Sequence, residues 1–290
     1  MKTIKFFISI LAIITFTSCE DVIQVDLDKG EPVITIDAFI NDMRSQQKVR
    51  LTFTDGYFSQ KPNDPVKGAS VNIKDLTTGV DFIFTDNNDG NYVYNINPPD
   101  TISRVGHVYE LTVTHQGNVF KASARMKRTA RVDSLISKFD EGGGLGNAPA
   151  GYKFAFLGFD VPGDTTDYYW IKSFRNGVFF NKGSEINICV DASYGNGADG
   201  FPFIPPIAEG ITPRGELFQK FDVCRVELHS IDLETFNFLT QVQAQTTNSG
   251  LFATSPENIK TNIANTTTDK VKVVGWFSMS AVSFKEAVAQ

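Results

Sequence analysis

The sequence predicts an all-β protein made of two β-sandwich-like domains, the second of which carries one α-helix. Short runs of alternating apolar and polar residues follow one another along most of the 290 residues, and Gly, Pro, Asn and Asp separate them. Helical periodicity is confined to residues 232–245. Seven short strands within about 100 residues are typical of an antiparallel sandwich of the immunoglobulin-like or transthyretin-like type.

The first domain is expected at residues 33–127. Alternation is plain at Val49, Leu51 and Phe53, which point to one face of their strand. Turn sequences such as Asn88-Asp89-Gly90 connect the runs. The expected strands are Val33–Ile40, Val49–Thr54, Ser70–Asp75, Asp81–Thr85, Asn91–Ile96, His107–His115 and Val119–Arg125.

The second domain is expected at residues 132–290, after the charged linker Met126–Val132. Asp232 can cap a helix at 232–245, and Ile231 and Phe236 have the spacing of a hydrophobic staple. Residues 191–215 are rich in Gly and Pro and form a loop longer than the usual limit of roughly 12–15 residues. The expected strands are Val132–Phe139, Tyr152–Asp160, Asp167–Arg175, Val178–Phe180, Glu185–Val190, Asp222–Ser230 and Val271–Phe284.

The composition argues against several classes of protein. Lys and Arg number 27 against 33 Asp and Glu, so the net charge is -6, and no basic block is present to bind nucleic acid. Only three His and three Cys are available as soft metal ligands, too few for most zinc frameworks. We therefore expect no nucleic-acid partner, no metal and no cofactor.

The first residues read as an export signal. Lys2 and Lys5 precede an apolar run of about 11 residues, which is the length of a signal-peptide core and too short to span a membrane. Ser18-Cys19 resembles the lipobox of bacterial lipoproteins, which implies cleavage after residue 18, acylation of Cys19 with fatty acids such as palmitate, and a lipidated tether at 19–32. Glu20-Asp21 resembles the signal that sends lipoproteins of the Bacteroidota to the cell surface.

Several motifs in order resemble a large uncharacterised outer-membrane lipoprotein family of the Bacteroidota. They are the opening from Cys19 to Val33, Phe159-Asp160-Val161-Pro162-Gly163, Val226–Ile231, Phe252–Pro256 and Gly275-Trp276-Phe277. Members carry a domain-of-unknown-function label and often accompany TonB-dependent receptors, so the resemblance implies such a receptor as partner. Asn265-Thr266-Thr267-Thr268 stands where glycines are usual before the last strand of the family.

A second resemblance covers residues 65–92. Pro65–Ile73 and Thr85–Tyr92 are similar to the paired strand and turn of carboxypeptidase-regulatory-like repeats. That resemblance implies a small prealbumin-type sandwich that serves as a spacer or docking unit and has no catalytic activity.

No catalytic constellation is visible. His107, His115 and His229 are expected at strand edges or on the surface, and no Gly-x-Ser-x-Gly elbow occurs. Asp160, Asp164 and Asp167 lie around a Pro-Gly turn and are expected in solvent. Asp86–Gly90 lacks the spacing of an EF-hand loop and is better explained as a hairpin turn. We therefore expect a protein that is not an enzyme.

Two features of the second domain leave alternatives open. Cys189 and Cys224 either form a disulfide in an oxidising envelope or remain buried thiols. The extended apolar segment Gly200–Ile207 either meets a partner or ligand or folds back onto its own sandwich. Its candidate contact residues, together with a strand tryptophan, are Phe201, Phe203, Ile204, Ile207 and Trp170.

The expected function is that of a non-enzymatic, lipid-anchored protein of the outer membrane, with the surface face favoured over the periplasmic one. As an accessory it would bind a TonB-dependent receptor. The alternative is a lipoprotein that binds a glycan, peptide or apolar nutrient on its own, in which case Trp170, Phe201 and Phe203 would line its pocket.

Overall fold

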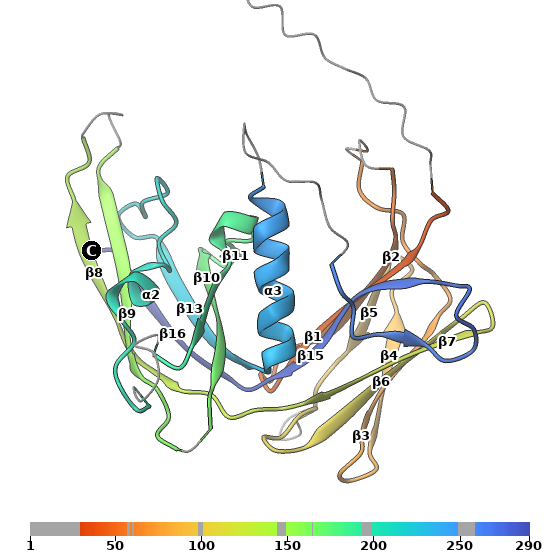
Figure 1. The fold of residues 1–290 in the computed structure, drawn as a ribbon. Helices are drawn as coiled ribbons and strands as arrows, with labels where there is room; N and C mark the ends of the chain where they lie inside the picture. Colours follow the sequence, from red (N-terminus) through yellow and green to blue (C-terminus); the bar gives the residue numbers. More distant parts are fainter. Residues whose placement is uncertain are drawn as a thin grey trace, which may run out of the picture. The chain divides into compact units, whose positions relative to one another are not determined.

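Strands dominate the computed structural model, which describes residues 30–290 apart from 57–58, 60, 98–100, 144–148, 164, 193–198 and 249–258 (Figure 1). The all-β prediction is confirmed. Within the described residues, the larger sheet follows the order β14-β7-β6-β3-β4-β5-β2-β1-β15, and a bridge between Lys127 and Ser280 nearly closes it. Its strands are β1 (Ile34–Asn41), β2 (Gln47–Phe53), β3 (Ser70–Asp75), β4 (Asp81–Asp86), β5 (Asn91–Tyr94), β6 (Val108–His115), β7 (Asn118–Arg125), β14 (Ala264–Asn265) and β15 (Val273–Ser280).

A smaller sheet in the order β11-β10-β13-β16, with β12 also paired to β10, follows later in the chain. Its strands are β10 (Tyr168–Arg175), β11 (Val178–Phe179), β12 (Asn187–Val190), β13 (Val223–Ile231) and β16 (Val282–Val288). The hairpin of β8 (Arg131–Asp140) and β9 (Gly151–Phe159), the short helix α2 (Pro205–Glu209) and the 3₁₀ turn η1 (Gly183–Glu185) accompany it.

The helix α3 (Leu233–Thr246) matches the predicted one. The side chain of Asp232 accepts a hydrogen bond from the backbone N–H of Thr235 at 2.8 Å, as expected of an N-cap. Figure 1 shows α3 between the two sheets, beside β10 on one side and β1 and β15 on the other. No helix of the described residues is both long enough and apolar enough to cross a membrane.

The end of the chain differs from the prediction of one strand at Val271–Phe284. The segment divides at Ala281 into β15, which pairs in parallel with β1, and β16, which pairs with β13. Buried Ala281 donates its N–H to the Ser230 hydroxyl at 2.9 Å, which fixes the crossing point. Alternation within a segment cannot show that its two halves join different sheets, so this exchange could not be predicted from the residue pattern.

Two hydrophobic cores lie within Pro32–Gln290, which is one compact unit. The inward side chains of the larger sheet form the first core, and β8, β9, β10, β13 and the segment around Phe203 form the second. Strands β14 and β15 come from residues 132–290 but complete the sheet of residues 33–127. The chain therefore crosses three times between the two sheets: after β7, before β14 and at Ala281, where β15 gives way to β16. The contacts between the two sheets form a seam.

Candidate functional site

An aromatic pocket lies at this seam. Its volume is about 350 Å³, within the range of small-molecule sites. Elements from both sheets and from α3 build it, because strands β1 and β10 turn their outer faces toward each other across the helix. The lining residues are Thr35, Asp37, Phe39, Trp170, Phe179, Phe180, Asn181, Ile186, Phe238, Leu239, Val242, Gly275 and Trp276.

Five rings from five elements form a continuous series along the pocket: Phe179, Trp170, Phe39, Phe238 and Trp276. Successive ring centroids are 6.3, 5.3, 6.4 and 4.5 Å apart. The last pair is stacked at 18°, whereas the first two pairs meet edge to face. Such a surface offers an apolar or aromatic ligand a large contact area at little cost in side-chain entropy.

The Trp276 indole is fixed in place by α3. Its N–H donates to the hydroxyl of Thr235 at 2.9 Å, and Thr235 is fully buried in the first turn of the helix. Gly275 precedes it with φ +112°, and a Cβ there would lie 2.0 Å from the Ile36 carbonyl oxygen. Only glycine permits this close approach of β15 to β1, so the backbone of the pocket wall depends on it.

Three polar side chains reach the pocket without a partner. Thr35, Asp37 and Asn181 line it, and none of them makes a side-chain hydrogen bond or ion pair with a described residue. Asp37 is open to the solvent of the pocket, yet protein atoms surround it, and this desolvation raises its pKa. A few convergent polar groups in an otherwise apolar pocket are typical of sites that orient a ligand.

A lysine lies beside the ring series. The ammonium of Lys172 is 3.9 Å from the centroid of Trp170 and 5.9 and 5.8 Å from those of Phe39 and Phe179, a cation–π arrangement. Burial lowers the pKa of Lys172 to about 8, although Glu227 and Asp37 act in the opposite direction.

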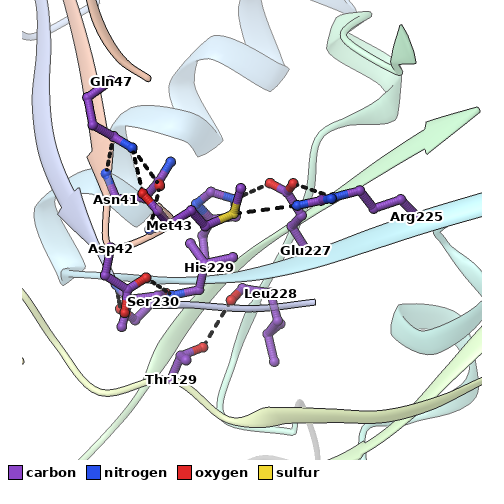
Figure 2. Close-up of polar contacts among 12 residues, drawn as sticks. Asn41, Asp42, Met43, Gln47, Thr129, Arg225, Glu227, Leu228, His229 and Ser230 are labelled. Atoms are coloured by element: carbon purple, nitrogen blue, oxygen red, sulfur yellow. Dashed lines mark hydrogen bonds and ion pairs between the residues drawn. The ribbon is translucent and has the colours of Figure 1, made fainter. Parts of the chain in front are cut away.

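On β13, which pairs with the strand of Lys172, Arg225, Glu227 and His229 form a row of linked polar side chains (Figure 2). Strand register places Glu227 directly opposite Lys172, and His229 opposite Trp170. Glu227 accepts from Arg225 at 2.7 Å and pairs with the His229 ring at 2.9 Å. Burial, and then the charge of Lys172, lowers the pKa of His229 to about 4, so the ring is neutral at pH 7. Burial alone would raise the pKa of Glu227, but His229 and Arg225 hold it below its usual value.

The turn between β1 and β2 fastens this face to the larger sheet (Figure 2). Buried Gln47 accepts from the Asn41 N–H at 3.0 Å and donates to the Met43 carbonyl at 3.1 Å, which shapes the turn. Asp42 then accepts from the Val282 N–H at 2.9 Å, and the Met43 sulfur lies 3.6 Å from Arg225. These contacts fix β1 against β13 and β16 and so hold the two walls of the pocket together.

A family model for a domain of unknown function, DUF4249, matches residues 20–286. The chain belongs to the DUF4249 family. No curated protein matches it. The matched segment contains every residue that lines the pocket, so the DUF4249 domain includes the whole candidate site.

In this DUF4249 chain, Trp170 and the segment Gly200–Ile207 do not form a common pocket. Trp170 points into the aromatic pocket, whereas its neighbour Tyr169 points to the opposite face of β10. There the ring centroids of Tyr169 and Phe203 are 5.4 Å apart. The prediction that these residues line one site is therefore wrong, because alternation along β10 separates them.

The segment itself folds back onto its own core, which was one of the two alternatives. Phe203 packs on Phe156 and Tyr169, and Ile207 packs on the second core from α2. Ile204 precedes α2 as its N-cap residue, and Phe201 is 51% exposed. The described part of the loop therefore covers the second hydrophobic core.

Cys189 and Cys224 are buried thiols that form no disulfide, so the disulfide alternative is wrong. In the sheet, Cys189 pairs with Tyr169 on one side of β10, while Cys224 pairs with Arg175 on the other side, six residues further along. The intervening strand and this offset keep the sulfurs apart. Burial raises the pKa of the Cys224 thiol to about 12. Cys19 lies outside the described residues, as does the family motif at 252–256.

Several polar residues expected in solvent are buried. His229 is 3% exposed, and neither ring nitrogen bonds a hydroxyl or thiol of the described residues. Buried Asp160 accepts from the Tyr169 hydroxyl at 2.6 Å, and buried Asp167 pairs with Arg128 at 2.7 Å. The prediction failed for Asp160 and Asp167 because a turn sequence does not reveal which other segments of the chain pack against the turn.

The region Asp86–Gly90, which was compared with an EF-hand loop, carries no cluster of metal ligands among the described residues. Asp86 accepts from the N–H groups of Gly68 and Asn88, and Asp89 accepts from Asn91. Their carboxylates therefore stabilise the hairpin turn, as the turn interpretation requires.

Sequence reasoning missed most of the pocket. Phe39 stands at a position of its strand that alternation assigns to solvent, and Phe238 lies off the predicted apolar side of α3. Aromatic residues at strand and helix positions that the pattern assigns to solvent were the available signal of a pocket. Asp37 and Lys172 gave none, since a charged residue on the outer face of a strand is ordinary.

Proposed function

We propose that the chain is a lipid-anchored binding protein of the cell envelope that holds a small, largely apolar ligand in the aromatic pocket. The series of five rings around a cavity of about 350 Å³ carries this proposal. Five large side chains that surround a space would close it if they served packing alone, because protein interiors leave few voids larger than a water molecule. Binding, not catalysis, is the activity proposed.

Intrinsic fluorescence tests the pocket directly. The chain has two tryptophans, Trp170 and Trp276, and both line the pocket. The uncharged probe 4-phenylbutan-1-ol should produce a saturable change in their emission. Val242→Phe, which adds a ring inside the pocket, should abolish the change, while Ile83→Phe, at a 70% exposed position on β4, should retain it. An unchanged emission in the wild type would contradict the proposal.

Anchoring is proposed from the sequence around Cys19. The basic start, the short apolar core and Ser18-Cys19 support acylation of the mature amino terminus. Acyl chains contribute about 0.8 kcal/mol per buried CH₂, so two or three of them hold a protein stably on a membrane. Metabolic labelling with a palmitate analogue should mark the chain, and Cys19→Ala should remove the label. A labelled Cys19→Ala chain would place the acylation elsewhere.

Partnership with a TonB-dependent receptor of the outer membrane is the remaining part of the proposal. It rests on the sequence resemblance to lipoproteins of the Bacteroidota, among which such receptors are common companions. The chain would then pass its ligand to the receptor from the cell surface. Cross-linking in native membranes should recover the receptor with the wild type and not with Cys19→Ala. Recovery of the chain alone at every detergent strength would contradict it.

A further inference from the structure

We infer that the pocket selects ligands that carry a protonated amine on an apolar body, and that the Asp37 carboxylate binds the amine. This inference rests on the proposed function. The geometry points to it because Asp37 lines the pocket and makes no hydrogen bond or ion pair with any described residue.

A ligand that fills the pocket removes water from Asp37. A carboxylate deprived of water is strongly destabilised unless a charge or hydrogen-bond donors compensate it. Here the described residues supply none in contact with the carboxylate, and the neighbouring lining is aromatic. The compensating charge must therefore arrive with the ligand, and an ammonium group is both cation and donor.

The cationic side chains near Asp37 do not compensate its charge by direct contact. Lys172 has its ammonium over the Trp170 ring and faces Glu227 across the strand pair. Lys48 and Arg50 on β2 are exposed, so water screens their charges. All three act on Asp37 through space, and their combined influence is smaller than the opposing effect of desolvation.

The aromatic rings of the pocket also favour a cationic ligand. Faces of Trp and Phe attract cations, as the position of Lys172 over Trp170 shows within the chain itself. An anionic ligand would instead set a second negative charge against Asp37 in a poorly hydrated space. A neutral ligand would leave the carboxylate desolvated or force it to take up a proton.

Three probes of one shape test the inference on the full chain in lipid nanodiscs: 4-phenylbutylamine, 4-phenylbutan-1-ol and 4-phenylbutyrate. Tryptophan emission is the readout. The amine should bind about tenfold or more tightly than the alcohol, as expected for a hydrogen-bonded charge pair, and the acid should bind most weakly. Asp37→Asn should remove the advantage of the amine over the alcohol. Asp133→Asn, at an exposed carboxylate on β8, should change neither.

The possible outcomes separate this inference from the proposed function. Equal binding of amine and alcohol, or an amine preference that persists in Asp37→Asn, overturns the role of Asp37 and leaves the pocket as a binding site. Tighter binding of the acid overturns it as well. No saturable change with any of the three probes overturns both the inference and the proposed function.

Discussion

The neutral, buried ring of His229 makes the stability of this protein depend on pH. In an unfolded chain a histidine takes up a proton as the pH falls below about 6.5, whereas in the folded chain burial and Lys172 delay this step until a pKa of about 4. The unfolded state thus binds more protons between these values, and the folded state loses stability as the pH falls through this window. The difference between the pKa of about 6.5 in the unfolded chain and about 4 in the folded chain lowers the unfolding free energy by about 3 kcal/mol once the pH is below both values.

Urea denaturation at pH 7, 5.5 and 4 measures this effect. His229→Gln removes the titrating ring but keeps a donor for Glu227, so the variant should lose about 3 kcal/mol less than the wild type between pH 7 and pH 4. His115→Gln is the comparison, with a smaller expected difference because that ring is partly exposed. Equal losses in the wild type and in His229→Gln would refute the reasoning.

Three further predictions concern the seam and the thiols. Gly275→Ala should lower the unfolding free energy by about 2 kcal/mol or more, because φ is positive and a Cβ would strike the Ile36 backbone. Urea denaturation measures this loss, and an unchanged unfolding free energy would contradict the close approach of β15 to β1 at Gly275. Lys172→Met should raise the pKa of His229, which an NMR titration of the ring reports, since the lysine charge lowers it. In the mature, acylated chain, Cys189 and Cys224 should react with a thiol reagent only after denaturation, and two thiols should then be counted; none would indicate a disulfide.

Local patterns were enough to predict most strands. Alternation such as that of Val49, Leu51 and Phe53 directly reflects one buried face, so β1–β7 lie where they were expected. The helix α3 was also predictable, because the cap at Asp232 is a local hydrogen bond. Each of these features depends on residues close together in sequence.

The candidate site depends on long-range pairing and could not be derived in this way. Trp170 was singled out, but its companions in the pocket come from β1, β11, α3 and β15. Which strands adjoin was invisible, above all the parallel pairing of β15 with β1 after the chain leaves the other sheet. The apolar segment around Phe201 suggested a binding loop, whereas Phe39 and Phe238, which line the pocket, stand at positions that the strand and helix patterns assign to solvent.

If the aromatic pocket holds a ligand in the cell, native mass spectrometry should detect that ligand on the chain purified from its own membranes and released gently from detergent. We expect a bound small molecule on the wild type and on Ile83→Phe, and its loss from Val242→Phe. A wild-type chain whose mass is that of the acylated protein alone, under conditions that preserve weak complexes, would show that the pocket is empty in the cell.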